Sequence, residues 1–289
     1  MRIALGLLAS ILISACGIVG RSGVAELGFD GRRALDFARW QVDQGPRIPG
    51  SESAGRTAAE IETRLRASGW IVRTQDWRYR GAGLRNVLGC RNTSAGKGVL
   101  LGAHYDTRPH ADRDLTQPDA PVPGANDGAS GTAVLVELAR VIPEKIPDRN
   151  LCLVFFDAED SGDQDGWDWV VGSQHFVEQL SSLPQSAVIV DMVGDADLQL
   201  YWEAGSNPDL SADIWAIGGR LGYGAFIPEA RHALLDDHTP FLLAGIPAID
   251  IIDFDYPYWH TTQDTTDKID ARSLEVVGRT LQAWLAGGA

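Results

Sequence analysis

The stretch VFFDAED, residues 154 to 160, decides how the rest of this 289-residue chain is interpreted. Its first three residues have the character of a buried strand, and that strand runs directly into three acids, Asp157, Glu159 and Asp160. Neighbouring carboxylates repel one another unless a cation or a shared proton compensates. The stretch therefore predicts a metal site at the carboxyl end of a buried strand.

Similar apolar stretches occur on both sides of it, such as VLLGA at residues 99 to 103 and AVIVDM at 187 to 192. Near-continuous apolar strands that alternate with helical patterns are typical of a mostly parallel sheet buried on both faces. We expect strands over residues 70–79, 84–91, 98–103, 151–156, 187–192, 198–203 and 248–252. We expect helices over residues 31–43, 54–68, 129–142, 169–180, 208–221, 238–244 and 271–285. The pattern predicts a single α/β domain over residues 31–289.

Acidic and histidine residues recur just beyond the ends of these strands. The recurrent residues are His104, Asp127, Asp160, Asp191 and His260. In open α/β sheets ligands bind at the carboxyl ends of the strands. We therefore expect these side chains to meet at one edge of the sheet.

Three of them form the expected metal-binding set. Asp127 alone would be a helix N-cap, but it ends the glycine-rich stretch PVPGAND, whose backbone can approach an ion closely. His260 lies in a segment without helical or strand periodicity, where a structural role explains it poorly. Asp127, Asp160 and His260 would leave the fourth position of a zinc ion open, which is a catalytic arrangement.

Glu159 is adjacent to a ligand without being one, which suits a general acid or base. Asp237 is expected to be functional, whereas Asp236 is interpreted as a helix start. Trp259 is either a core residue or one wall of an apolar pocket over the metal. The remaining histidines that we assign to surface or structural positions are His110, His175 and His232.

The formal net charge of −14 and a pI near 4.8 exclude a nucleic-acid-binding protein, because a polyanion would be repelled. Cationic ligands are favoured, including the free amino terminus of a peptide. Such peptides are the expected substrates.

Residues 1–15 have the pattern of a secretory signal, with an uncleaved membrane anchor as the alternative. The segment Ile13-Ser14-Ala15-Cys16 resembles a bacterial lipobox, which implies a lipid on Cys16, a tether over residues 16–30 and a place in the bacterial cell envelope. In that disulfide-permissive compartment Cys90 and Cys152 could pair. Because both fall in predicted strands, where buried free cysteines are common, we expect free thiols.

Six motifs resemble, in order and spacing, those of the zinc-dependent exopeptidase family M28, which contains secreted aminopeptidases and animal-type glutaminyl cyclases. They are HYD (104–106), PGANDGASG (123–131), FFDAED (155–160), VDMVGD (190–195), DDHTPF (236–241) and WHTTQDT (259–265). The resemblance runs from about Leu84 to the C-terminus. It implies a three-layer α/β/α sandwich with a central mixed sheet.

Two chemistries within this family fit the motifs. By resemblance, the aminopeptidases bind two zinc ions that share Asp127, with His104 and Asp191 on one ion and Asp160 and His260 on the other. The cyclases bind one zinc through Asp127, Asp160 and His260, while Asp191 and Asp237 form a carboxylate network with Glu159.

The resemblance favours the cyclase. The Trp259-His260 pair, the acids before His238 and the Glu159-Asp160 pair are similar to cyclase-type members. The implied reaction converts an N-terminal glutamine into pyroglutamate and releases ammonia. A catalytically silent envelope binding protein is the other alternative, but its expected mark, a missing ligand or a missing Glu159, is not found in this sequence.

Overall fold

The computed structural model describes residues 28–91, 97–143 and 149–287. The expected signal peptide, the lipid on Cys16 and most of the tether lie outside the described residues. Among the helices that are described, none is both long and apolar enough to cross a bilayer.

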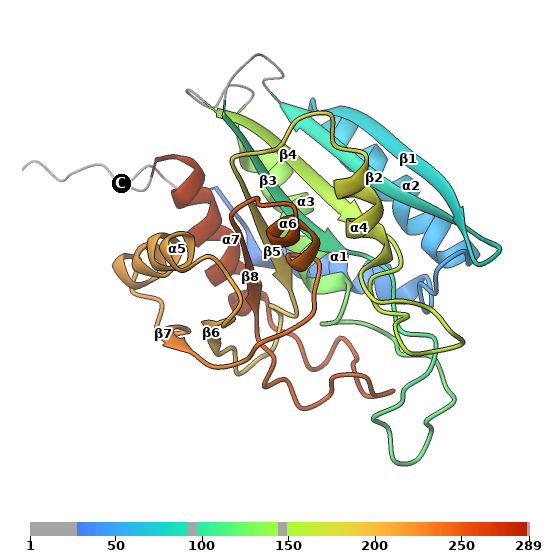
Figure 1. The fold of residues 1–289 in the computed structure, drawn as a ribbon. Helices are drawn as coiled ribbons and strands as arrows, with labels where there is room; N and C mark the ends of the chain where they lie inside the picture. Colours follow the sequence, from blue (N-terminus) through green and yellow to red (C-terminus); the bar gives the residue numbers. More distant parts are fainter. Residues whose placement is uncertain (1–27, 92–96, 144–148, 288–289) are drawn as a thin grey trace, which may run out of the picture.

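The main sheet confirms the mixed, mostly parallel topology. Within the described residues it contains six strands in the order β1-β2-β4-β3-β5-β8. Their bounds are β1 Ile71–Tyr79, β2 Ala82–Arg91, β4 Arg149–Phe156, β3 Lys97–His104, β5 Ser186–Asp191 and β8 Ala248–Ile252. The pairs β1-β2 and β2-β4 are antiparallel, and the other three pairs are parallel. The carboxyl ends of β3, β4, β5 and β8 therefore meet at one edge (Figure 1).

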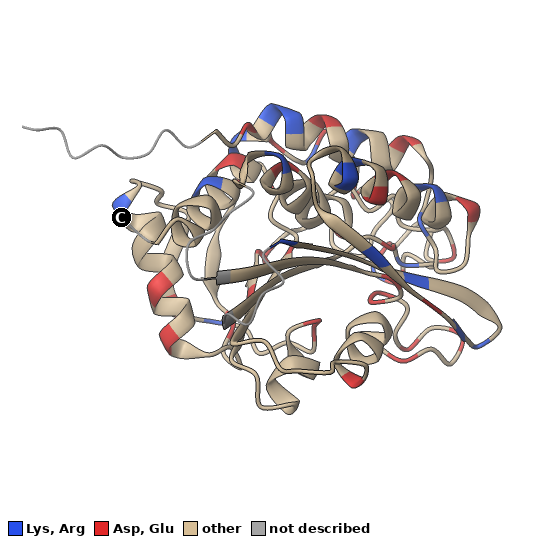
Figure 2. Cartoon of the chain, turned by 90° about the horizontal axis from the view of Figure 1, so that it is seen from above, with Lys and Arg blue, Asp and Glu red and all other residues tan. Residues whose placement is uncertain are grey.

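Helices cover both faces of this sheet, as Figure 2 shows with the sheet seen along its edge. Their bounds are α1 Gly31–Asp43, α2 Glu52–Ala67, α3 Ala129–Val141, α4 Val171–Glu178, α5 Pro208–Arg220, α6 Thr239–Leu243 and α7 Ala271–Leu285. Helices α1, α2, α3 and α7 form one layer, and α4 and α6 lie on the opposite face (Figure 1). The α/β/α sandwich is thus confirmed.

The strand of the opening stretch shows why two helical layers are needed. Successive side chains of a strand point to opposite faces. Leu153 and Phe155 accordingly pack in the core beneath α1, α3 and α7, while Val154 and Phe156 pack in a second core with Phe176 and Phe241 of α4 and α6. With both faces apolar, the strand is held rigidly and delivers Asp157 to Asp160 at its end.

The sequence did not predict β7, residues Phe226–Ala230, which pairs in parallel with the short β6, Leu200–Trp202. Only Phe226 of its five residues is buried, and Pro228 interrupts it. An exposed strand that contains proline lacks the period-2 alternation from which strands are recognised.

Cys90 and Cys152 form a disulfide, so the expectation of free thiols is wrong. The antiparallel register of β2 and β4 places the two residues directly opposite one another, with their Cα atoms 4.2 Å apart. This pairing follows from register, which the two strand patterns alone do not specify.

Candidate active site

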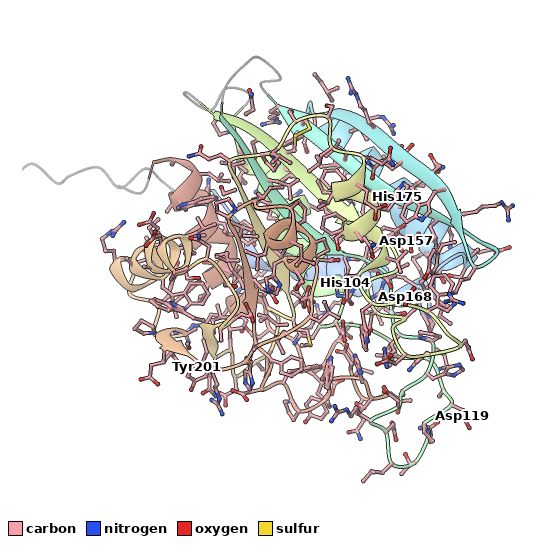
Figure 3. The ribbon with its side chains drawn as sticks, viewed as in Figure 1. His104, Asp119, Asp157, Asp168, His175 and Tyr201 are labelled. Carbon is pink, nitrogen blue, oxygen red and sulfur yellow. A yellow bond between two sulfur atoms is a disulfide. The ribbon has the colours of Figure 1, made fainter. Side chains whose placement is uncertain are left out.

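The residues expected to form a metal site converge at the carboxyl edge of the sheet. His104 is the last residue of β3 (Figure 3), and Asp191 is the last residue of β5. Asp160 lies in the turn that follows β4, and Asp127 lies just before α3. His260 is carried there by the loop after β8. All five side chains are buried.

Asp127, Asp160 and His260 offer ligand atoms that lie within 4.8 Å of one another. His260 Nε2 is 3.1 Å from Asp160 Oδ1 and 3.9 Å from Asp127 Oδ2. Oδ2 of each aspartate is buried and has no hydrogen-bond partner among the described residues. Buried carboxylate oxygens without partners are costly unless a cation binds them. Two carboxylates and one imidazole are also a donor set that suits zinc, so these residues fit the ion.

A second group shares Asp127 with the first. His104 Nε2 is 3.2 Å from Asp127 Oδ1 and 3.1 Å from Asp191 Oδ1, and these atoms also satisfy the spacing of a metal site. The sequence left open whether the site binds one ion or two. The structure brings together the candidate ligands for both alternatives.

The electrostatics of the site favour added positive charge. Burial by itself would lower the pKa of His260, but the neighbouring carboxylates of Asp160 and Asp112 outweigh it and raise the pKa to about 9. Burial raises the pKa of Asp191 above its usual range, an effect that the neighbouring His104 opposes. A divalent cation supplies the charge that these groups otherwise obtain from protons.

Glu159 lies beside the first group, as expected of an acid or base. Its backbone N–H and that of Asp160 donate to the two carboxylate oxygens of Asp106, at 3.1 and 3.2 Å, which holds the turn in place. Burial raises the pKa of Glu159 well above its usual value; His104 opposes the shift, and Asp236 adds to it. A raised pKa suits a carboxyl group that accepts and returns a proton during a reaction.

Three residues at or next to these groups have left-handed backbone conformations that side chains other than glycine rarely adopt. They are Ala158 (φ 60°), Met192 (φ 43°) and His260 (φ 56°). Each costs on the order of 1 kcal/mol or more and persists only where the surroundings enforce it. Their clustering here agrees with a functional site.

Asp127 does not cap α3. The N-cap is Gly128, with φ of 94° and no side-chain cap hydrogen bond. A Cβ at Gly128 would lie 2.3 Å from the carbonyl oxygen of Asp106, so only glycine fits there. The carboxylate of Asp264 accepts the N–H groups of Asn126 and Asp127, which orients the Asp127 side chain toward His104 and His260.

The structure places Asp236, rather than Asp237, on the wall of the pocket at this edge. The interpretation of Asp236 as a helix start is wrong, because α6 begins at Thr239 and its N-cap, His238, makes no side-chain cap hydrogen bond. Burial and the charge of Asp191 raise the pKa of Asp236 to about 7. Asp237 is fully buried behind it, and burial and the charge of Asp236 raise its pKa strongly.

The pocket has a volume of about 230 Å³ and combines the candidate ligands with apolar walls. Its apolar lining consists of Trp169, Met192, Leu234, Leu235, Ile252, Phe254 and Trp259. Trp259, which the sequence left open between core and pocket wall, is half-buried and lines the pocket. Trp169 was missed by sequence reasoning; its ring stacks parallel to that of His260, with centroids 6.1 Å apart.

Sequence reasoning also missed Arg108 and Asp112, which lie in the long loop after β3. Asp112 Oδ1 lies 3.2 Å from Nδ1 of His260, on the side of the ring away from Asp160, although the two atoms do not have the geometry of a hydrogen bond. Arg108 binds both oxygens of Asp112 at 2.8 and 3.0 Å, and its Nη1 donates to Asp160 at 3.3 Å. A histidine that binds a metal commonly donates its other ring N–H to a carboxylate, and Asp112 is the carboxylate near enough to take that role. The loop has no periodicity, so no sequence signal pointed to it.

The three histidines assigned to surface or structural positions belong to none of the candidate metal groups of the described residues. His175 stacks on Trp77, and His232 lies edge-on to Phe254 and 3.3 Å from Asp255. His110 is 41% exposed.

The chain is similar to a known family and to several known proteins. The model of peptidase family M28 matches residues 86–285. The chain is 25% identical to a glutaminyl-peptide cyclotransferase of Bos taurus, over 84% of this chain and 78% of the relative. A solved glutaminyl cyclase of Bacteroides thetaiotaomicron, bound to N-acetylhistamine, is 32% identical with a TM-score of 0.84, over 90% of this chain and 98% of that one. A solved leucine aminopeptidase precursor of the same organism is 33% identical with a TM-score of 0.84, over 90% and 97%.

Proposed function

The chain belongs to peptidase family M28, and we propose that within this family it is a zinc-dependent glutaminyl-peptide cyclotransferase. The observation that carries the proposal is the group Asp127, Asp160 and His260, with Glu159 beside it, at the base of a small pocket with two tryptophan walls. The substrates are peptides with a free N-terminal glutamine, and the products are the pyroglutamyl peptide and ammonia.

The pocket suits such a substrate in size and charge. A volume of about 230 Å³ accepts one side chain rather than a folded chain. The rings of Trp169 and Trp259 can hold the apolar methylene groups of glutamine, while Glu159, Asp191 and Asp236 line the same pocket and attract the positively charged α-amino group. The net charge of −14 favours the approach of the same cation.

Zinc held by Asp127, Asp160 and His260 supplies Lewis-acid polarisation of the side-chain amide carbonyl. The bound α-ammonium group first loses one proton to solvent, and Glu159 then accepts a second proton from the resulting amine as its nitrogen forms a bond to the amide carbon. The bond from that carbon to the amide nitrogen then breaks, and Glu159 returns the proton to the departing ammonia. Asp236 acts on Glu159 through its charge, and we assign Asp191, which lines the same pocket and acts on Asp236 through its charge, to the same set of interacting carboxylates.

We assign Asp237, the residue expected from the sequence, a supporting position behind this set. Its charge raises the pKa of Glu159, but by less than burial or the charge of Asp236. Its carboxylate does not line the pocket, so a direct contact with substrate falls to Asp236.

A second candidate function is a two-zinc aminopeptidase that hydrolyses the N-terminal residue of peptides. The group His104, Asp127 and Asp191 is the observation that favours it, because it provides a complete second set of ligands that shares Asp127. In that reaction Glu159 would remove a proton from the water that attacks the first peptide bond.

Zinc content and substrate preference together decide between the two. We expect one zinc per chain at this edge, release of ammonia from an N-terminal glutamine peptide and no release of leucine from leucine amide. The matched variant is His104→Gln, which removes one ligand of the second group only. Loss of one of two zinc ions in that variant, together with leucine amide hydrolysis by the unaltered protein, would establish the aminopeptidase instead.

We also propose that the protein is exported and anchored to the cell envelope through a lipid on Cys16. The support is the lipobox-like segment at residues 13–16. Globomycin-sensitive processing and partition into detergent, both lost in Cys16→Ser, are the expected results. Partition of the unaltered chain into the aqueous phase would contradict the anchor.

A further inference from the structure

A further group of buried polar side chains, which shares Asp236 with the pocket wall, lies where the loop before α6 meets β6 and β8. It consists of Glu203, Asp236, His238 and Asp250. Each of the four is at most 6% exposed. Three of them, Asp236, His238 and Asp250, offer ligand atoms within 4.8 Å of one another.

Glu203 determines which ring nitrogen of His238 has a free lone pair that can bind a cation. The Glu203 carboxylate accepts the N–H groups of Gly205 and Leu234 and the hydroxyl of Ser206, and it lies 3.1 Å from Nε2 of His238. Three donors therefore already point at the two oxygens of Glu203, which act as acceptors. An ionised carboxylate only accepts hydrogen bonds, so Nε2 of His238 carries the hydrogen and Nδ1 keeps its lone pair.

That lone pair faces Asp250 across 3.9 Å, too far for a hydrogen bond. Nδ1 of His238 and both carboxylate oxygens of Asp250 are buried and have no hydrogen-bond partner within the part of the chain that the structure describes. Asp250 is 1% exposed. Three unpartnered acceptor atoms that face one point require a positively charged or proton-donating occupant.

We propose that Asp236, His238 and Asp250 bind a second divalent cation, with Glu203 orienting the histidine. The donor set, one imidazole and two aspartates, is the same as that of Asp127, Asp160 and His260. Both groups also have a carboxylate near the second ring nitrogen of their histidine. Glu203 lies 3.1 Å from Nε2 of His238, and Asp112 lies 3.2 Å from Nδ1 of His260. Nitrogen and oxygen donors in this number fit zinc among the common biological ions.

The surrounding charge favours a cation at this point. Burial raises the pKa of Asp250 well above its usual range, and Asp236, Asp191 and Glu203 raise it further. The cation offsets this repulsion, whereas without one Asp250 would have to hold a proton. A cation and a proton on Asp250 can be told apart by substitution. Asparagine has nearly the shape of a protonated aspartate, but it lacks the negative charge of an aspartate that binds a metal ion.

Such an ion would hold one wall of the catalytic pocket. Ala233, Leu234, Leu235 and Asp236 line that pocket and belong to the loop that leads into α6. The ion ties this loop to Asp250 of β8, and the hydrogen bond from Leu234 to Glu203 ties it to the end of β6. Its role is therefore structural, and it does not depend on the reaction proposed for the pocket.

The test compares Asp250→Asn with the matched control Asp253→Asn. Asp253 is equally buried and follows the same strand, but it accepts the N–H groups of Gln199 and Asp255 and belongs to no candidate metal group within residues 28–91, 97–143 and 149–287. The full chain, folded in the presence of zinc, is treated briefly with dipicolinate under native conditions and its zinc content is measured. Ions in the open pocket are removed first, because all three of their ligands line it, whereas His238 and Asp250 of the proposed second site do not.

We expect one zinc per chain to remain in the unaltered protein and in Asp253→Asn, and none to remain in Asp250→Asn. Equal retained zinc in all three proteins, or none in the unaltered protein, would overturn the proposal. If Asp250→Asn does not fold, anomalous scattering at the zinc edge from crystals of the unaltered protein decides. A peak between His238 and Asp250 is then expected, and its absence rejects the site. Ammonia release from a glutamine peptide, measured alongside, reports separately on the proposed function.

Discussion

Replacing Asp112 with alanine tests whether the loop after β3 positions a metal ligand. The substitution removes the carboxylate that lies 3.2 Å from Nδ1 of His260 and that binds both nitrogens of the Arg108 fork. His260 then loses the carboxylate nearest to its Nδ1 atom. Arg108 keeps only its contacts with Asp160 among these groups.

The expected effect is on zinc affinity. Loss of the carboxylate behind a metal-binding histidine typically weakens metal binding about 10- to 100-fold, which corresponds to about 1.4 to 2.7 kcal/mol. Asp112→Asn keeps the shape and an acceptor oxygen but not the charge, so it should lie between alanine and the unaltered protein.

The assay is competition for zinc between the apoprotein and a chromophoric chelator of known affinity. The matched control is Asp119→Ala, because Asp119 lies in the same loop, is exposed and is remote from His104 in Figure 3. At saturating zinc, turnover by Asp112→Ala should recover most of the unaltered value. The reasoning is refuted if Asp112→Ala binds zinc as tightly as Asp119→Ala while the melting temperatures of the two agree.

Three further predictions concern catalysis, stability and pH. Glu159→Gln should lower turnover by about 10² to 10⁴-fold with zinc content unchanged, since Glu159 belongs to no candidate metal group of the described residues; substantial remaining ammonia release would exclude its role. The double variant Cys90→Ala/Cys152→Ala opens a cross-link of sequence separation 62 and should lower the free energy of unfolding by about 2–4 kcal/mol in urea titrations, with no change as the contrary result. Burial raises the pKa of Asp253 to about 7 in the folded protein. The folded protein therefore binds a proton at this carboxyl group more tightly than the unfolded chain does. The resulting stabilisation is fully present below the unfolded pKa of 3.8 and is lost as the pH rises through 7. The free energy of unfolding should therefore fall more between pH 4 and 7 for the unaltered protein than for Asp253→Asn, and identical slopes would contradict this.

Local patterns in the sequence were sufficient for most of the fold. α1 and α7 begin and end at the expected residues, and the capping acids Asp30 and Asp270 explain their starts. The apolar strands were recognised because a sheet buried on both faces needs near-continuous hydrophobic runs. β7 was missed because it is short, exposed and interrupted by Pro228.

The same local patterns located the edge at which the candidate ligands meet. Parallel strands end at one side of a sheet, so an acid or histidine that follows each strand end must come close to the others. Asp127, Asp160 and His260 were expected on this ground and on the family resemblance, and the structure brings them within 4.8 Å of one another. Their role as ligands stays a prediction that zinc binding has to test.

What the sequence determined, then, is the layered α/β architecture and the edge where its acids gather, because both depend on residues close together in the chain. Tertiary structure alone decided that Asp236 rather than Asp237 reaches the pocket, that Asp112 stands behind His260, and that Cys90 pairs with Cys152. Each of these depends on strand register or on the path of an aperiodic loop. Such features are set by packing between distant segments, and no short stretch of sequence encodes them.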